Sequence, residues 1–409
     1  MLRRTGNPGA HAVRILHLST RLIVGGSQEN TVLSCRGAAD AGHTVALGYG
    51  PIYGPEGSLL GMVAGDSRIE RFEIPDLVRE LSPTRDVRCH GQLRKLIATW
   101  KPDVVHTHSS KAGILGRSAA RAERVRAIVH TVHGLPFHSY ESWWRNGVYV
   151  RAERWAARRC DAIVSVADAM TRQALASGVG RAEQYRTIRS GMEVGPFLAE
   201  PTQRSAVRAR LGFDDSTIVL GTLSRLAQHK GHDDLIEALA PRLRSSARGS
   251  LALLWIGDGW WRERLTARLK DLGIADRVVL TGLVVPSEIP ALLSAVDLVV
   301  HPSYREGLPR AVVQGLLSGK AAIAYDVDGA REVCIPEETG LLVRPGDIGA
   351  LRQGIERLTA NAHEREAMGR RGRELVREAY DWRLMSRELL ALYQELLDSG
   401  ARRPPGRVA

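Results

Sequence analysis

The sequence is poor in cysteine and contains no long apolar run. Its four cysteines are scattered and form no CxxC pair, so we expect neither a disulfide framework nor a cysteine zinc site, and the pattern fits a reducing cytosol. No apolar stretch approaches the roughly 18 residues that span a bilayer. Arg3 and Arg4 precede no apolar segment, so no signal peptide is expected. These absences predict a cytoplasmic globular protein.

The charge is unbalanced, and the imbalance lies mostly in the first half of the chain. The formal net charge is +12, and residues 1–200 hold 27 Lys and Arg against 18 Asp and Glu. The remainder holds 30 against 27. Such an excess suits nucleic acid, an anionic membrane surface or a phosphorylated substrate. Because the sequence shows no helix-turn-helix, RRM or zinc signature, we do not expect nucleic acid as a partner.

Short apolar runs alternate with longer helical patterns along almost the whole chain, which is typical of βαβ units and parallel sheets. A length of 409 residues favours two domains. We predict an N-terminal domain over residues 13–195 and a C-terminal domain over 205–379. Glycine and proline residues within 190–210 indicate an interdomain linker.

The predicted strands fall into two series, one for each domain. The first series is 14–19, 44–48, 69–74, 104–106, 127–131, 162–166 and 186–188. The second series is 218–223, 251–256, 278–281, 298–301, 322–325 and 340–343. A last amphipathic helix is expected over 380–397, and the tails 1–12 and 401–409 show no periodicity. Doubly wound domains bind ligands at the carboxyl ends of their strands, so the polar residues at those ends are the candidates for a site.

Arg225 and Lys230 lie five residues apart where a strand gives way to a helix. Arginine offers a planar fork for phosphate oxygens, and lysine offers a compact, mobile charge. The alternative is a solvated pair of cations on a loop. Gly231 and an amphipathic helix follow the pair, which favours a site for a diphosphate.

A second strand end carries a carboxylate, a turn glycine and a helix-starting proline. Glu306 would precede a helix that starts near Pro309, with Gly307 and Leu308 presenting backbone N–H groups to an anion. Gln314 would lie two turns on, on the same side. Alternatively, Glu306 only complements the helix dipole and Gln314 is an exposed helix residue. Beside the two upstream cations, a carboxylate that binds hydroxyl groups indicates a nucleotide sugar as ligand.

Glycines and histidines mark strand ends in the first half. Gly25 and Gly26 follow the first strand and permit close approach of the backbone to a ligand, although any tight turn favours glycine. His133 ends the fifth strand, and we predict a functional role for it. For His106 and His108, which end the fourth strand, functional and structural roles stay equally open. Two alternating histidines suggest a metal, but no further ligand cluster supports one.

Taken together, these residues resemble the retaining GT-B glycosyltransferases of glycosyltransferase family 4. The resemblance runs from Gly25-Gly26 through segments 106–113 and 130–134 to the R-x4-K-G and E-x7-E regions. Segments 106–113 and 130–134 are similar to bacterial enzymes of polysaccharide and lipid-linked glycan assembly. The resemblance implies an α/β GT-B fold with two Rossmann-like doubly wound domains facing across a cleft, and a last helix, 380–397, that packs back on the first domain.

The resemblance also assigns roles by position. Catalytic roles are implied for His133, near the anomeric centre, and for Glu306, against the hydroxyls of the donor sugar. The implied donor-binding residues are Gly25, Gly26, Arg225, Lys230, Gly307, Leu308 and Gln314. Gln314 stands where the family usually has a second glutamate that grips the ribose. Glutamine still accepts one hydrogen bond and donates another, so we expect altered nucleotide contacts.

Two further segments are ambiguous. Asp326-Val327-Asp328 looks like the DxD motif with which another class of sugar-transferring enzymes holds a divalent ion, but the family needs no metal, and we expect none here. Segment 143–159 carries Trp144, Val148 and Trp155 on one helical stripe, with arginines beside it. It is either a helix that rests on an anionic membrane or a packed helix with an exposed basic edge.

The function expected on this basis is transfer of a sugar from a nucleotide-diphosphate sugar, with UDP favoured by the family's habit, to an acceptor hydroxyl with retention. No cofactor or metal is expected. The expected partners are the donor and a glycan or lipid-linked acceptor of cell-surface polysaccharide synthesis, with a possible peripheral contact with the inner face of the plasma membrane. The alternatives are a nucleotide-sugar epimerase or hydrolase on the same fold and a non-catalytic basic binding protein.

Overall fold

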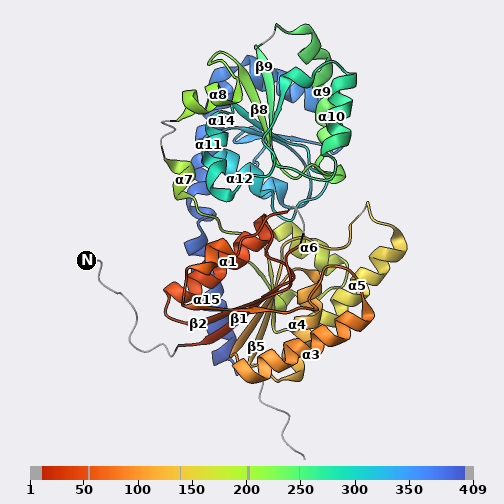
Figure 1. Ribbon diagram of the computed structural model, residues 1–409, viewed down its shortest axis with the longest axis vertical. Coiled ribbons are helices and arrows are strands. Elements are labelled where there is room, and N and C mark those ends of the chain that lie inside the picture. Colours follow the sequence, from red (N-terminus) through yellow and green to blue (C-terminus); the bar gives the residue numbers. More distant parts are fainter. Residues whose placement is uncertain (1–11, 54–55, 139, 200–202, 248, 401–409) are drawn as a thin grey trace, which may run out of the picture. The chain divides into compact units, whose positions relative to one another are not determined.

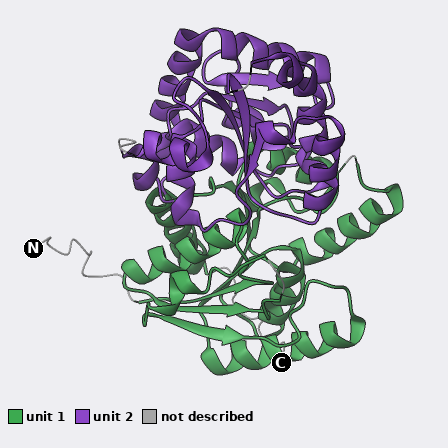
Figure 2. Cartoon of the chain, turned by 45° about the horizontal axis from the view of Figure 1, so that its top comes forward, with its two compact units in different colours: residues 1–192, 382–409 green, residues 193–381 purple. Residues whose placement is uncertain are grey.

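The computed structural model describes most of the chain (Figure 1), namely residues 12–53, 56–138, 140–199, 203–247 and 249–400. These residues divide into two compact units (Figure 2). Unit 1 extends to Met192 and resumes at Trp382, and unit 2 extends from Glu193 to Asp381. The tails predicted at 1–12 and 401–409 lie outside the described residues, apart from Ala12.

Unit 1 is built on a seven-stranded parallel sheet with the order β3-β2-β1-β4-β5-β6-β7. Its strands are β1 (Arg14–Ser19), β2 (Thr44–Tyr49), β3 (Ile69–Glu73), β4 (Val104–His108), β5 (Ala127–Val132), β6 (Ala162–Ser165) and β7 (Tyr185–Thr187). Its helices are α1 (Gly26–Asp40), α2 (Gly61–Ala64), α3 (Pro83–Trp100), α4 (Ser110–Ala122), α5 (Trp143–Ala157), α6 (Asp168–Ala176) and α15 (Trp382–Asp398). The strand order reverses at β1, which is the switch point of a doubly wound sheet.

Unit 2 repeats this architecture on a six-stranded parallel sheet with the order β10-β9-β8-β11-β12-β13. Its strands are β8 (Ile218–Leu223), β9 (Leu251–Ile256), β10 (Val278–Leu280), β11 (Leu298–His301), β12 (Ala322–Tyr325) and β13 (Gly340–Val343). Its helices are α7 (Gly195–Leu198), α8 (Arg204–Leu211), α9 (His232–Ser245), α10 (Arg262–Asp271), α11 (Ile289–Ser294), α12 (Arg310–Leu317), α13 (Ile348–Ala360) and α14 (Ala362–Ala379). Here the order reverses at β8, so the loops after β8 and β11 lie beside the switch point.

The central strands of the unit 2 sheet are buried on both faces because helices cover both sides of that sheet. All six residues of β9 are buried, and β11 and β12 are buried throughout. Parallel sheets of this kind produce continuous apolar runs instead of an alternating pattern. The apolar runs were therefore sufficient to predict these strands.

The last helix, α15, belongs to unit 1 and lies along α1 (Figure 1). Trp382, Met385 and Leu389 are buried in the same core as residues of α1 and β1. The two helices approach closely at Gly37, where a Cβ atom would lie 2.0 Å from the hydroxyl oxygen of Ser386. A larger residue at Gly37 would separate the helices.

All thirteen predicted strands are present among the described residues, and the prediction of two Rossmann-like α/β domains is confirmed. Two differences have physical causes. β4 continues past His106 to His108, because Thr107 and His108 stay in the sheet as buried polar residues. The segment 190–210, expected to be a linker, contains α7 and most of α8, because Arg208 of α8 is buried against Asp297.

Candidate active site

In unit 2 the loops after β8 and β11 are held against each other at the carboxyl end of the sheet. Gly231 ends the first loop with φ 68°, and a Cβ atom there would lie 1.9 Å from the carbonyl oxygen of Pro302. Only glycine combines that left-handed backbone with such a close contact. The Tyr304 N–H donates to the carbonyl of His229 at 2.8 Å. The two predicted halves of the donor site are therefore adjacent.

Lys230 and Glu306 form the centre of this arrangement. The Nζ of Lys230 donates to Oε1 of Glu306 at 2.6 Å, and each side chain is 14% exposed. His301, the last residue of β11, has its Nε2 2.8 Å from the same Oε1. Among the described residues nothing donates to Oε2 of Glu306. The carboxylate therefore has one oxygen held by the protein and the other available to a ligand.

The charge state of Glu306 follows from its neighbours. Burial alone would raise the pKa of Glu306, but the charges and hydrogen bonds of Lys230 and His301 outweigh it and hold the pKa well below its ordinary value. An ionised carboxylate only accepts hydrogen bonds, so the His301 Nε2 donates to it. Glu306 is thus suited to accept hydrogen bonds from hydroxyl groups and unsuited to act as an acid.

The same region contains groups that can bind an anion. Burial, and then the charge of Lys230, lowers the pKa of His229 to about 4. Lys230 uses one of its three donors on Glu306, which leaves two for phosphate oxygens. The backbone N–H groups of Gly307 and Leu308, just before α12, have no acceptor among the described residues. Cation and N–H donors together fit an anionic ligand.

Arg225 lies on the first loop, and the residues that follow it anchor this loop. Leu226 and Ala227 are fully buried, and the Leu226 N–H donates to the carbonyl of Asp258 at 3.1 Å. The Arg225 guanidinium lies 5.9 Å from the ring centroid of the exposed Trp260. Arg225 and Lys230 thus lie at opposite ends of an anchored loop.

Gln314 lies on α12 and is 7% exposed. It is therefore not the exposed helix residue of the alternative interpretation. The two aspartates of the DxD-like segment are engaged by protein groups, since Asp326 accepts from Arg331 and Asp328 accepts from the backbone N–H of Glu306 at 2.8 Å. The second contact fixes the loop that carries Glu306.

In unit 1, His133 follows β5, and Gly25 immediately precedes α1 at the end of the β1 loop. Both lie at the carboxyl end of their own sheet. The Nε2 of His133 is 3.2 Å from Nδ1 of His108, the last residue of β4. His106 and His108 are completely buried, and burial holds the pKa of each well below its ordinary value. These neighbours are therefore neutral.

Some residues of these sites escaped sequence analysis. His17 joins His106 and His108 in a buried group whose possible ligand atoms all lie within 4.8 Å of one another. His301 and Asp328 hold the side chain and the backbone of Glu306. The available signal was a polar residue at the end of an apolar strand, which fits His301 but does not identify its partner.

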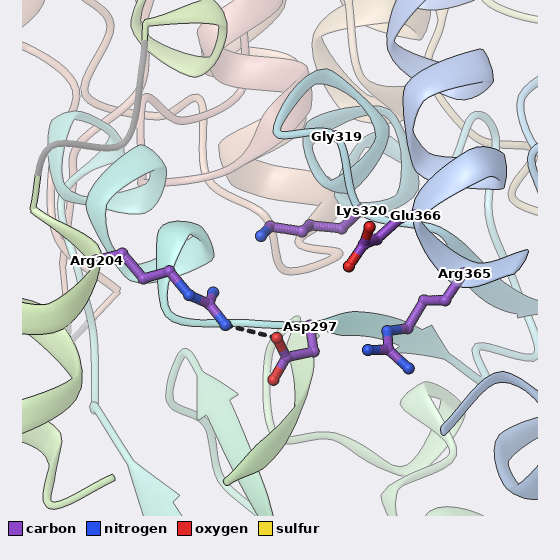
Figure 3. A pocket seen from close by; sticks show the side chains of 6 residues that line it. All are labelled: Arg204, Asp297, Gly319, Lys320, Arg365 and Glu366. Atoms are coloured by element: carbon purple, nitrogen blue, oxygen red, sulfur yellow. Dashed lines mark hydrogen bonds and ion pairs between the residues drawn. The ribbon is translucent and has the colours of Figure 1, made fainter. Parts of the chain in front are cut away.

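A pocket of about 300 Å³ lies away from this site, on the amino-terminal side of β11. Its residues are Arg204, Asp297, Gly319, Lys320, Arg365 and Glu366, and Figure 3 shows Arg204, Lys320 and Arg365 around Asp297. The carboxylate of Asp297 accepts from Arg204 at 2.5 Å and from the buried Arg208 at 2.7 Å. Burial and Arg204 lower the pKa of Lys320 to about 8. Asp297 is therefore a carboxylate that balances several neighbouring cations.

Replacement of Asp297 by alanine is expected to lower the free energy of unfolding of unit 2 by about 3–5 kcal/mol, because it leaves Arg208 charged, buried and without its partner. The N–H of Val219 loses an acceptor as well. Urea denaturation followed by hydrogen exchange of β8 and β11 peptides measures the change. Asp271→Ala, at an exposed position at the end of α10, is the matched control and should change stability by less than about 0.5 kcal/mol. Equal effects would contradict this account.

The stripe predicted for segment 143–159 is exposed. In α5, Trp143 is 86% and Trp144 54% exposed, and Val148 and Trp155 are also exposed. The helix packs through Glu153, Ala156 and Ala157, where Glu153 accepts from the fully buried Arg117 at 2.8 Å. α5 is thus a packed helix, as in one of the two interpretations, and its aromatic stripe is exposed. Among the described residues, no helix is both long and apolar enough to span a bilayer.

Comparison with known families finds one matching family model for each unit. The family model described as glycosyl transferases group 1 matches residues 203–375, and the model described as glycosyltransferase family 4 matches residues 24–194. The first match lies in unit 2, where Lys230 and Glu306 meet. The second covers most of unit 1, including His133.

Individual relatives are similar over most of their length. The UDP-Gal:alpha-D-GlcNAc-diphosphoundecaprenol alpha-1,3-galactosyltransferase of Escherichia coli is 28% identical over 72% of this chain and 76% of its own. The GDP-mannose-dependent alpha-(1-6)-phosphatidylinositol monomannoside mannosyltransferase of Mycolicibacterium smegmatis is 30% identical over 68% of this chain and 72% of its own. The structure of Anabaena HepE in complex with UDP-glucose has a TM-score of 0.79 at 21% identity, over 94% of this chain and 100% of HepE. The likeness to HepE concerns the fold, and the predicted GT-B fold is confirmed.

Proposed function

The chain belongs to the group 1 glycosyltransferases of family 4, and we propose that it moves a sugar from a UDP-sugar to an acceptor hydroxyl with retention of configuration. The proposed setting is the synthesis of cell-surface polysaccharide or of a lipid-linked glycan. The name of the Escherichia coli relative, which specifies UDP-galactose and a diphosphoundecaprenol acceptor, supports the nucleotide and the acceptor class. The mycobacterial relative uses GDP-mannose, so GDP-sugars are the main competing donors.

The observation that carries this proposal is the Lys230–Glu306 pair. It sets an ammonium group with two remaining donors beside a carboxylate whose Oε2 receives no hydrogen bond from the described residues. A diphosphate bonded to a sugar presents anionic oxygens, which suit the ammonium group, next to hydroxyl groups, which suit the carboxylate. Neither a bare phosphate nor a nucleic acid backbone would need the carboxylate, whose charge repels phosphate.

In the proposed reaction the bond between the anomeric carbon and the diphosphate oxygen breaks while the acceptor oxygen bonds to the same carbon. Negative charge grows on the leaving diphosphate, where Lys230, Arg225 and the N–H groups of Gly307 and Leu308 stabilise it. The acceptor proton passes to a phosphate oxygen of the leaving group. Attack and departure occur on the same face, which retains the configuration. No step assigned here uses a metal, so we propose metal-independent transfer.

The test is a transfer assay with purified protein and a panel of UDP-, GDP- and ADP-sugars, paired with thermal shift and repeated with EDTA. Selective stabilisation by one nucleotide class, unchanged by EDTA and lost in Arg225→Ala, is the expected result. Turnover of the donor without any acceptor would favour the epimerase or hydrolase alternative. Absence of a shift with every nucleotide sugar, in folded protein, would favour the binding-protein alternative.

We also propose that unit 1 contacts anionic membrane through α5. Exposed tryptophans suit the interfacial region of a bilayer, and the neighbouring arginines suit anionic lipid head groups. Trp143→Ala combined with Trp144→Ala should weaken sedimentation with phosphatidylglycerol vesicles at least tenfold, while neutral phosphatidylcholine vesicles bind little of either protein. Trp260→Ala, which removes an exposed tryptophan of unit 2, is the matched control. Equal losses in the control and the double variant would contradict a role for α5.

A further inference from the structure

A row of buried histidines leads to His133 along one face of the unit 1 sheet. His17 of β1 pairs in register with His106 of β4, and His108 lies two residues further along the same face. The Ile15 and Val104 side chains on this face belong to the core that α1 and α15 cover. The row therefore runs from the interior toward the carboxyl end of the sheet, where His133 is only partly buried.

Three of these rings form one hydrogen-bonded chain. Nδ1 of His17 lies 3.1 Å from Nε2 of His108, and Nδ1 of His108 lies 3.2 Å from Nε2 of His133. Successive rings are stacked, with interplanar angles of 21° and 22°. His106 stands outside this chain, because its nitrogens pair with the hydroxyls of Tyr393 at 2.5 Å and Thr131 at 2.7 Å.

The two inner rings are neutral. Burial lowers the pKa of His17 to about 3, and burial followed by the neighbouring histidines holds the pKa of His108 well below its ordinary value. A neutral imidazole has one N–H donor and one bare nitrogen acceptor. All hydrogen bonds in the chain must then point the same way, either toward His133 or away from it.

The buried end of the chain selects the direction. Nε2 of His17 is completely buried and has no partner among the described residues. A buried N–H without an acceptor is rarer in proteins than a buried acceptor without a donor, so the His17 proton belongs on Nδ1. His17 then donates to Nε2 of His108, whose own proton sits on Nδ1. His108 in turn donates to Nε2 of His133.

We propose that His108 is a positioning residue that holds His133 in the tautomer with its proton on Nδ1. If the proposed glycosyl transfer is correct, on which this role rests, His133 donates a hydrogen bond from Nδ1 to an oxygen of the reacting sugar. It does not serve as a general base through Nε2, because that nitrogen is occupied by the His108 proton. The chain also ends at His17, so no proton leaves through it.

The direct test is the tautomer of His133 in the unmodified protein. Long-range ¹H–¹⁵N spectra of protein labelled with ¹⁵N-histidine at pH 7.5 distinguish protonated from bare ring nitrogens, and comparison with His133→Gln assigns the signal. The expected result is a proton on Nδ1 and a bare Nε2. A proton on Nε2 overturns the proposal. This reading requires no donor or acceptor, so it stands apart from any failure to detect transfer.

Variants of the chain separate positioning from packing. His108→Leu removes the donor to His133, and a mixture of tautomers is expected together with kcat roughly two- to tenfold lower, the effect of one hydrogen bond. His108→Asn restores a donor near the position of Nδ1, so it should restore both the single tautomer of His133 and kcat. His17→Leu moves the unpartnered nitrogen to Nε2 of His108, so the tautomer of His133 should stay the same. A tautomer that changes in His17→Leu, or that does not respond to His108→Leu, overturns the proposal.

Metal binding is the competing use of the same rings, because His17, His106 and His108 offer ligand atoms within 4.8 Å of one another. A metal ligand must offer a bare nitrogen to the ion, which would break the chain. Elemental analysis of purified protein and a zinc titration in the same spectra decide the matter. Stoichiometric zinc that shifts the ring signals of His17, His106 and His108 overturns the proposal. Ring signals that zinc leaves unchanged support it.

Discussion

Lys230→Ala is expected to lower kcat/KM for sugar transfer by about 10²–10³. This is the usual effect of removing one preorganised donor from a charge that develops in the transition state. Lys230 is anchored for this role, because its bond to Glu306 at 2.6 Å and its low exposure fix the ammonium group before substrate binds. The assay is initial-rate kinetics with the donor identified by the thermal-shift screen.

A control variant separates catalysis from folding. Lys270→Ala removes an exposed cation from α10 of the same unit and should leave kcat/KM within about twofold, the range of surface substitutions. If Lys230→Ala lowers only the melting temperature while the folded protein keeps its kcat/KM, the pair is structural and the proposed donor site is wrong.

The Lys230–Glu306 pair also has a defined pH dependence. Because the folded-state pKa of Glu306 is lowered, the unfolded chain binds a proton more readily than the folded chain as the pH falls below the ordinary value of about 4.3. The stabilisation is therefore fully present above that pH and is lost toward the lower folded-state pKa. The rate of sugar transfer, measured against pH near neutrality, should therefore show no change that is due to protonation of Glu306.

The fold was predictable because its information is local. Each strand of a parallel sheet is a short apolar run, and each intervening helix has its own period. The limits of this reasoning appear at β4, which was expected to end at His106 but continues to His108. The apolar run is shorter than the buried strand, because hydrogen bonds to neighbouring side chains let polar rings stay in the core.

The site was predictable only in part. Position at a strand end identified Lys230 and Glu306, and the structure brings them together. The partners that set their chemistry come from other loops, such as Asp328, which holds the backbone of Glu306. Likewise, the role of Arg208 depends on Asp297, 89 residues away. Such pairs depend on tertiary contacts that no local pattern specifies.

Unit 1 is expected to lose stability steeply between about pH 6.5 and pH 5, before the pH reaches the range in which carboxylates titrate. Four of its histidines, His17, His106, His108 and His130, are at most 3% exposed. Burial is the first cause of the lowered pKa of each one. They remain neutral in the folded chain but take up protons near pH 6.5 in the unfolded chain.

The sign and size follow from proton linkage. Below pH 6.5 the unfolded state binds more protons, so the free energy of unfolding falls as the pH falls. Each such histidine contributes about 1.4 kcal/mol per pH unit, and four together contribute roughly 5 kcal/mol per unit. Because whole domains are stable by only about 5–15 kcal/mol, a fall of about one to three units below pH 6.5 should suffice to unfold unit 1.

Hydrogen exchange of peptides from β1, β4 and β5, measured in urea between pH 7.5 and pH 5, gives the slope directly. His17→Leu should reduce that slope by about 1.4 kcal/mol per pH unit, because one proton uptake disappears. A slope that corresponds to less than one proton would show that the buried rings are already charged. That result would also undermine the hydrogen-bond chain to His133, which requires neutral rings. Acid sensitivity of unit 1 and a single tautomer at His133 thus have the same physical origin, imidazoles kept neutral by burial.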